Sequence, residues 1–412
     1  MSTKISRNVS IDTNFYNFLR SVLGFWFKKQ FRLTADIPEE VINLSAPFLL
    51  FPNHQGFWDP FMAGIFIKYP VFYIASAAVF RYPLFEYFMK LLGAIPKKKA
   101  QSDLDSIKHI MKIRDAGGVI GVFPEGRRTW DGTTLPLVYA TSKLIKLLKI
   151  PVVTALFKGG YYSHPRWGKH IQKGKVRIEY KLLFQKDEIK KLSVEEIHKI
   201  LTEDLSFDEI AYQEKVKHLY TGKNPAEYME QAVYLCPNCK ETGTIRSSGD
   251  TVVCSSCGYS VTIDEYRNLT SSRNKVIFNT IRDWIKWQNS EFEGYISGIY
   301  GRDNEKILIQ DSGLTVQRVL PGGKRMKPFL NNAGITLSVV KMTILDKNGK
   351  DIISFRAKDL HAANVQNKEK LDFYYDSILY NIFDKKKRFS AYKWLVAIQQ
   401  IQRLAGTNAP SV

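Results

Sequence analysis

Between residues 46 and 185, short apolar runs alternate with stretches of helical spacing, and this alternation constrains the fold more than any other feature. Short apolar runs bounded by turn residues are typical of buried strands, and apolar residues every three or four positions are typical of helices. The apolar runs are 47–51, 71–77, 119–123 and 152–157, and the helical stretches are 60–67, 84–92, 103–115 and 137–148. The pattern predicts an α/β domain, with a mixed sheet flanked by helices.

The N-terminal residues 1–39 contain an aromatic-rich segment, FYNFLRSVLGFWFKKQF, at residues 15–31. A basic, aromatic helix of this kind can lie in a membrane interface, so we interpret 1–39 as a membrane-contact segment. The alternative is a helix that only packs on the core. We expect no cleavable signal peptide, and no apolar run reaches the roughly 18 residues that span a bilayer.

Asn53-His54-Gln55-Gly56-Phe57-Trp58-Asp59-Pro60 directly follows the first apolar run. Five residues along a regular helix turn two side chains about 140° apart, so His54 and Asp59 cannot share a helical face. They can meet if His54 lies in a loop and Asp59 opens the next helix. Asp is a favoured N-cap, and Pro suits the first helical position.

A histidine paired with a carboxylate can act as a general base, because the carboxylate fixes the imidazole tautomer and stabilises the imidazolium. Such a base can activate an acceptor hydroxyl without a nucleophile from the protein. The alternative is that Asp59 only caps its helix and His54 is an ordinary loop residue.

A second stretch, Val122-Phe123-Pro124-Glu125-Gly126-Arg127-Arg128-Thr129, ends another apolar run. Ligands of open α/β sheets gather at such strand ends, and guanidinium groups match phosphate in a bidentate way. Gly93-Ala94-Ile95-Pro96-Lys97-Lys98-Lys99 adds a further cationic group.

These stretches resemble the glycerophosphate and lysophosphatidate acyltransferase family over about residues 40–185. NHQGFWD resembles its first block, GAIPKKK its second and FPEGRR its third, and 150–153 with Gly159-Gly160 fits the fourth. The resemblance implies that His54 is the general base and that Asp59 orients it. It implies an acceptor site formed by Lys99, Glu125, Gly126, Arg127 and Arg128, with Arg128 on the phosphate. Lys99 stands where the family commonly has Arg.

The same resemblance implies a fatty acyl donor, acyl-CoA or acyl-carrier protein, and a lysophosphatidate-type phospholipid acceptor in phospholipid biosynthesis. We therefore expect a peripheral, monotopic enzyme on the cytoplasmic face of a membrane, with the lipid surface, the lysophospholipid and acyl-carrier protein as partners. No nucleic acid is expected.

All four cysteines form two C-x2-C pairs separated by 14 residues, which are Cys236, Cys239, Cys254 and Cys257. Four thiolates at this spacing predict one Zn2+ in a zinc ribbon. Because four protein ligands leave no open position, the predicted zinc is structural.

The remaining chain is predicted as a helical connector at 186–235, the ribbon at 236–262 and a β-rich domain at 270–412. In the connector, Ser193-x-x-Glu196 and Ser206-x-x-Glu209 are capping-box patterns. Strands are expected at 294–300, 306–309, 313–319, 336–345 and 351–356, with a hairpin turn at Asn348-Gly349. A final amphipathic helix at 390–404 completes an order of elements similar to a pleckstrin-homology domain.

The chain carries 60 Lys and Arg against 40 Asp and Glu, a formal net charge of +20. Such a charge implies an anionic partner. It leaves two alternatives to the enzyme: a non-catalytic membrane-lipid-binding scaffold, or a zinc-ribbon nucleic-acid-binding protein. The pair of His54 and Asp59 argues against the scaffold, and the nucleic-acid alternative explains nothing in residues 40–185.

Overall fold

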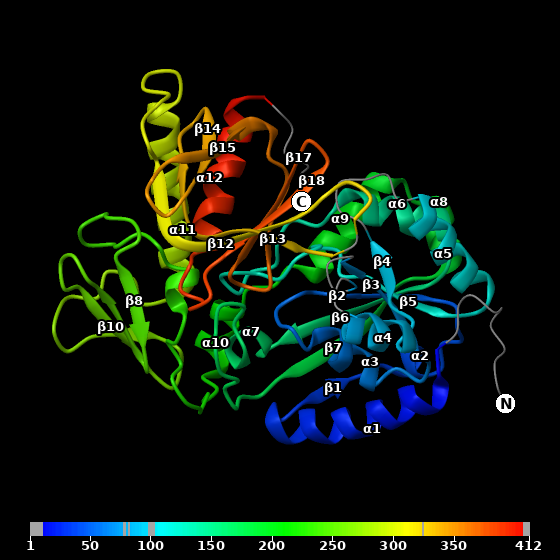
Figure 1. Cartoon of the computed structure of the whole chain (residues 1–412). Coiled ribbons are helices and arrows are strands. Elements are labelled where there is room, and N and C mark those ends of the chain that lie inside the picture. The colour runs from blue at the N-terminus through cyan, green and yellow to red at the C-terminus, as the bar shows by residue number, and fades with distance from the viewer. Residues whose placement is uncertain (1–10, 77–79, 81–82, 98–103, 324, 407–412) are drawn as a thin grey trace. The chain divides into compact units, whose positions relative to one another are not determined.

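The computed structural model describes residues 11–76, 80, 83–97, 104–323 and 325–406 (Figure 1). These residues form two compact units. The first comprises the chain through Arg166 together with Ile171–Gly222, and the second comprises Trp167–His170 with the chain from Lys223 onward.

The first unit is built on a seven-stranded sheet in the order β1-β7-β6-β2-β5-β3-β4. Neighbouring strands are parallel except β6 and β7, which are antiparallel, so the expected mixed sheet is confirmed. The strands are β1 (Thr34–Asp36), β2 (Leu49–Pro52), β3 (Val71–Ser76), β4 (Ile95–Lys97), β5 (Val119–Gly121), β6 (Val152–Lys158) and β7 (Arg177–Phe184).

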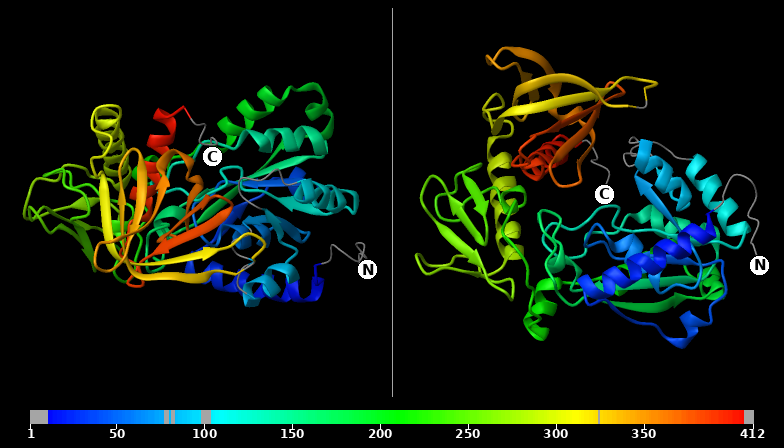
Figure 2. Two further views of the ribbon diagram at one scale, coloured as in Figure 1. Left: turned by 45° about the horizontal axis from the view of Figure 1, so that its top comes forward. Right: turned by 60° about the horizontal axis from the view of Figure 1, so that its bottom comes forward.

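Helices cover both faces of this sheet (Figure 2). On one face, α5, α6, α8 and α9 bury apolar residues such as Ile113, Ile145 and Leu201 in one cluster; on the other, α1, α2 and α3 bury Phe27 and Met62 in a second. The helices are α1 (Thr13–Gln30), α2 (Glu39–Ile42), α3 (Asp59–Ile65), α4 (Pro83–Leu91), α5 (Leu104–Asp115), α6 (Tyr139–Leu148), α7 (Gly160–Ser163), α8 (Lys186–Lys191), α9 (Val194–Leu205) and α10 (Glu209–Val216).

One of the two capping boxes is present and the other is not. The Ser193 side chain accepts a hydrogen bond from the Glu196 N–H, and α9 begins there as expected. The Ser206 prediction was wrong, because Asp208 caps α10 by accepting from the N–H groups of Ile210 and Ala211. This places Glu209 at the first helical position, where it is fully buried.

The second unit begins with a short helix, η2 (Met229–Gln231), and a small antiparallel sheet in the order β11-β10-β9-β8. Its strands are β8 (Ile245–Ser248), β9 (Thr251–Cys254), β10 (Ser260–Ile263) and β11 (Leu269–Thr270). The long helix α11 (Ile281–Ile299) follows, with Thr280 as its N-cap.

A second seven-stranded sheet, antiparallel throughout, has the order β15-β14-β13-β12-β18-β17-β16. Helix α12 (Ala391–Leu404), capped by Ser390, buries Trp394 and Ile398 and packs against β16 and β17 (Figure 2). The strands are β12 (Ile309–Val319), β13 (Lys327–Leu337), β14 (Lys341–Leu345), β15 (Asp351–Arg356), β16 (His361–Gln366), β17 (Lys370–Tyr375) and β18 (Ile378–Phe383), with η3 (Ala357–Asp359) between β15 and β16.

This unit confirms a β-rich domain with a terminal helix but corrects three expected strands. Residues 294–300 belong largely to α11, whose buried Phe292 and Ile296 follow helical spacing. The interval 336–345 is two strands, because the chain turns between Leu337 and Lys341. Of 306–309, only Ile309 is in a strand. Among the described residues, no helix combines the length and apolar content of a membrane span.

Candidate active site

His54 and Asp59 are in direct contact in the loop that joins β2 to α3. His54 Nδ1 lies 2.9 Å from Asp59 Oδ2, and the side chains are 18% and 4% exposed. A carboxylate only accepts hydrogen bonds, so Nδ1 carries the hydrogen in this pair. The other ring nitrogen, Nε2, then carries the lone pair that a general base needs.

The sequence suggested that Asp59 caps its own helix, and this prediction was wrong. Helix α3 begins at Asp59, after Trp58. The same Oδ2 atom that contacts His54 accepts the N–H groups of Gln55 at 2.7 Å and Gly56 at 2.8 Å. Three hydrogen bonds to one buried oxygen therefore fix the loop and the imidazole together.

Gly56 and Asn53 each have a structural reason for their residue type in this loop. A Cβ at Gly56 would lie 3.2 Å from Asp59 Oδ1, so a side chain would crowd the carboxylate. Asn53 Oδ1 accepts the Phe157 N–H at 2.7 Å, which ties the end of β2 to β6 before the chain enters the loop.

The surroundings of His54 favour its neutral form. Burial lowers its pKa below the ordinary histidine value, Asp59 raises it, and the charges of Arg128 and Arg166 lower it further. The net direction is downward. The imidazole also packs against the Phe123 ring, with ring centroids 4.1 Å apart and the planes tilted by 31°. A neutral imidazole beside cationic groups can accept a proton and so act as a base.

Glu125 holds the loop that carries His54 through main-chain contacts. Its Oε1 accepts the His54 N–H at 2.6 Å, and its Oε2 accepts the Leu135 N–H at 2.8 Å. The side chain is 1% exposed, and burial raises its pKa to about 8. Gly126 follows with a φ of +66°, which bends the chain sharply after β5.

The charges of Arg128 and Arg166 act on His54, and the charge of Arg127 acts on Glu125. Arg127 and Arg128 are half-buried. Arg166 is 5% exposed; its Nη1 donates to the Arg128 carbonyl at 2.9 Å, and its guanidinium lies 4.4 Å from the centre of the Trp130 ring. Arg166 lies beyond the four blocks, and the sequence carried no signal for it. Lys99 lies outside the described residues.

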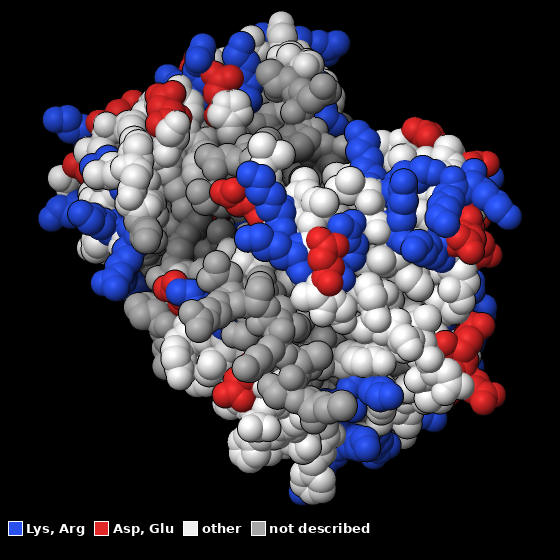
Figure 3. All heavy atoms as spheres, turned by 90° about the vertical axis from the view of Figure 1, so that its right-hand side faces the viewer, with Lys and Arg blue, Asp and Glu red and all other residues white. Residues whose placement is uncertain are grey.

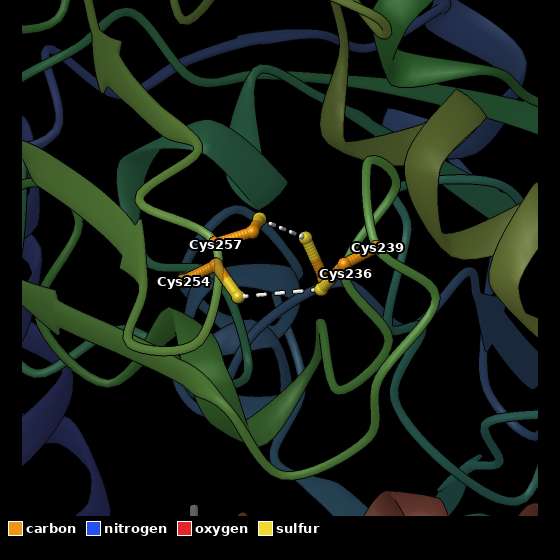
Figure 4. A group of neighbouring side chains, drawn as sticks. All are labelled: Cys236, Cys239, Cys254 and Cys257. Atoms are coloured by element: carbon orange, nitrogen blue, oxygen red, sulfur yellow. Dashed lines mark hydrogen bonds between the residues drawn. The ribbon is translucent and has the colours of Figure 1, made fainter.

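The four cysteine sulfurs converge from two turns in the second unit (Figure 4). Cys236 Sγ lies 3.7 Å from Cys257 Sγ, Cys239 Sγ lies 3.7 Å from Cys254 Sγ, and all four lie within 4.8 Å of one another. A tetrahedral site with metal–sulfur bonds of about 2.3 Å requires sulfur–sulfur distances of about 3.8 Å. The cluster therefore has the dimensions of a four-thiolate metal site.

Comparison with known proteins places a family match on the first unit. Residues 32–158 match the family model described as Acyltransferase. The chain is 27% identical over 142 residues to the 1-acyl-sn-glycerol-3-phosphate acyltransferase of Bacillus subtilis (strain 168), which covers 34% of this chain and 68% of that protein. Of three further curated relatives the chain covers less than half the length. The N-terminal region therefore contains an acyltransferase-family domain, distantly related to these proteins.

Two solved structures are similar to parts of the chain. The crystal structure of the 1-acyl-sn-glycerophosphate acyltransferase of Thermotoga maritima has a TM-score of 0.41 and 18% identity, covering 52% of this chain and 85% of that one. The N-terminal PH domain of the human ARAP2 protein has a TM-score of 0.19 and 11% identity, covering 24% of this chain and 84% of that one. The second is a weak likeness to the antiparallel C-terminal domain.

Proposed function

We propose that the first unit transfers a fatty acyl group from a thioester donor to the hydroxyl of a lysophosphatidate-type phospholipid. The contact between His54 Nδ1 and Asp59 Oδ2 carries the proposal, because it leaves Nε2 as the base. The names of the curated relatives, all 1-acyl-sn-glycerol-3-phosphate acyltransferases, support the choice of acceptor.

In the proposed reaction His54 Nε2 takes the proton of the acceptor hydroxyl while the hydroxyl oxygen attacks the thioester carbonyl. Asp59 stabilises the imidazolium that forms, as the carboxylate does in hydrolase triads. The tetrahedral intermediate collapses by breaking its carbon–sulfur bond, and the leaving thiolate takes the proton back from the imidazolium. The products are an ester and a free thiol, and no protein nucleophile takes part.

The acceptor phosphate is proposed to bind Arg128, with Lys99 and Arg127 as further cationic contacts. Support comes from the positive charge of Arg128, which lowers the pKa of His54. Glu125 and Gly126 shape this side of the site by fixing the turn after β5. An arginine fork suits a phosphate because two N–H groups can meet two oxygens.

Contact with a membrane surface is proposed for α1 and α4. Phe18, Val22 and Phe25 lie on one stripe of α1 and are 65%, 50% and 73% exposed, while Phe27 of the same helix is fully buried. Exposed apolar stripes of this kind mark interaction surfaces. Helix α4 adds the exposed Tyr87, and Lys28 and Lys29 lie in the last turn of α1. In the view of Figure 3, Lys and Arg side chains gather over the upper right, with a few Asp and Glu among them.

The four-cysteine cluster is proposed to hold one structural zinc ion. The sulfur geometry fits tetrahedral coordination by Cys236, Cys239, Cys254 and Cys257. With four thiolates bound, the ion supplies folding energy for the surrounding turns and has no position left for a substrate.

The test is release of thiol from acyl-CoA by the purified full chain, with lysophosphatidate, glycerol 3-phosphate and lysophosphatidylcholine as separate acceptors. We expect turnover with lysophosphatidate, and a raised acceptor KM in Arg128→Gln. The matched control is Arg114→Gln, which changes an arginine on α5. Turnover that is equal with all three acceptors would contradict the proposed selection of lysophosphatidate, and no turnover with any would contradict the function.

A further inference from the structure

Glu209 is a fully buried carboxyl group at the start of α10, outside the residues that match the acyltransferase family. Such a group is costly to bury unless it is hydrogen-bonded. Its Oε2 accepts the Gln55 Nε2–H at 2.9 Å and the Gly159 N–H at 3.0 Å. Its second oxygen, Oε1, has no hydrogen-bond partner among the described residues.

The partner of Glu209, Gln55, follows His54 in the catalytic loop. Gln55 is 2% exposed, and its side-chain Oε1 accepts the Tyr161 N–H at 3.2 Å. Its own main-chain N–H donates to Asp59 Oδ2 at 2.7 Å. Gln55 therefore connects Glu209, through its side chain, to Asp59 Oδ2, through its main-chain N–H.

We propose that Glu209 is a positioning residue for the His54–Asp59 pair, acting through Gln55. This inference rests on the proposed function for its effect on turnover. By holding the Gln55 amide, Glu209 fixes the direction of the Gln55 main-chain N–H and hence one of three hydrogen bonds on Asp59 Oδ2. Catalytic pairs are sensitive to such support, because a misplacement of about 1 Å can cost about 100-fold in rate.

The chain around Glu209 provides a rigid anchor. The Glu209 N–H donates to the Gly132 carbonyl at 3.0 Å, and the Thr134 N–H donates to the Phe207 carbonyl at 2.9 Å. Thr134 Oγ1 also donates to the Leu205 carbonyl at 2.8 Å. The start of α10 is thus hydrogen-bonded to the loop that follows Arg127 and Arg128. The same segment therefore supports both this loop and, through Gln55, the loop that carries His54.

Close packing leaves little freedom for this arrangement to change. A Cβ at Gly160 would lie 2.6 Å from Gln55 Oε1, so only glycine admits the Gln55 amide in this position. Burial raises the pKa of Glu209 to about 8. A neutral carboxyl still accepts both N–H groups through Oε2.

Steady-state kinetics with acyl-CoA and lysophosphatidate test the role. Glu209→Leu keeps the volume and removes the acceptor; we expect kcat to fall by about 100-fold, with acceptor KM within about threefold. Glu209→Gln keeps a carbonyl acceptor and should restore kcat to within about threefold of wild type. Glu214→Leu, at an exposed glutamate of the same helix, is the matched control and should behave as wild type.

A second pair of variants covers the case in which Glu209→Leu does not fold. Gln55→Leu removes the same hydrogen bond from the other side and should reproduce the fall in kcat. Where both single variants fold, Gln55→Leu combined with Glu209→Leu should be no slower than the slower single variant, because the two act through one contact. Effects that multiply, or a Glu209→Leu variant within threefold of wild-type kcat, would overturn the inference.

Nuclear magnetic resonance separates this inference from the proposed function. The Nδ1–H of His54, bonded to a carboxylate, should give a downfield proton signal that is absent from His54→Ala. We expect that signal to be retained in Glu209→Gln and lost or broadened in folded Glu209→Leu or Gln55→Leu. An unchanged signal in these variants would refute positioning by Glu209, whether or not the chain turns over acyl-CoA.

Discussion

Replacing Asp59 by Asn separates the charge of the carboxylate proposed to assist His54 from its geometry. A single atom, Oδ2, accepts from His54, Gln55 and Gly56. In Asp59→Asn the amide oxygen must take that position, because an NH2 group there would face two main-chain N–H donors. The loop and the imidazole tautomer are therefore kept, and only the negative charge is removed.

The size of the effect follows from the charge separation at the site. Two unit charges about 4 Å apart interact by about 4 kcal/mol at an effective dielectric of about 20. A half-developed imidazolium in the transition state loses about half of this interaction and a fully formed one loses all of it, so the barrier rises by about 2 to 4 kcal/mol. At about 1.4 kcal/mol per tenfold change, kcat falls by about 30- to 1,000-fold.

The assay compares Asp59→Asn with Asp59→Ala in thiol release and in thermal unfolding. Asp59→Ala leaves the N–H groups of Gln55 and Gly56 without their acceptor, at about 1 to 3 kcal/mol each, so its unfolding temperature should drop. Asp59→Asn should unfold near the wild-type temperature. A kcat within fivefold of wild type in Asp59→Asn, or equal destabilisation of both variants, would refute this reasoning.

Three further outcomes are expected. A base must be neutral and the pKa of His54 is lowered, so kcat/KM should rise with pH through a midpoint below 6.5. Because the charge of Arg128 lowers this pKa, Arg128→Gln should move the midpoint upward. A midpoint above 6.5 in wild type would contradict this. Metal analysis should find one zinc per chain, and Cys254→Ser should lose the metal and lower the unfolding temperature of the second unit; a metal-free wild type of equal stability would contradict the site. Phe18→Ser with Phe25→Ser should weaken binding to anionic vesicles by more than 100-fold, at about 1.5 to 3 kcal/mol per buried aromatic side chain, and unchanged flotation would contradict membrane contact.

Much of the first unit could be predicted from the sequence because its central strands are continuously apolar. Residues 47–51 and 152–157 correspond to β2 and β6, which are buried almost throughout. β1 and β4 have only three residues each, and so short a run gives no periodicity. In the second unit, the segment at 294–300 was mistaken for a strand because its apolar residues continue a helix that begins at Ile281.

The site divides in the same way. The contact between His54 and Asp59 was predictable, because the two residues are only five positions apart and the residues between them indicate a loop followed by a helix start. The support from Glu209 was not, because Gln55 and Glu209 lie 154 residues apart and meet only through tertiary packing. The capping-box pattern at Ser206 gave Glu209 only a helix-capping role, since local spacing contains no information about burial. The position of Arg166 was not predictable for the same reason, because it contacts Arg128 from 38 residues further along the chain.

The most direct measurement is mass spectrometry of the lipid products formed from acyl-CoA and lysophosphatidate by wild type and His54→Ala. We predict diacylated product with wild type and a fall of at least about 1,000-fold in the folded His54→Ala variant, as expected when a catalytic base is removed. Equal amounts of product from the two proteins would contradict the assignment of His54 as the base.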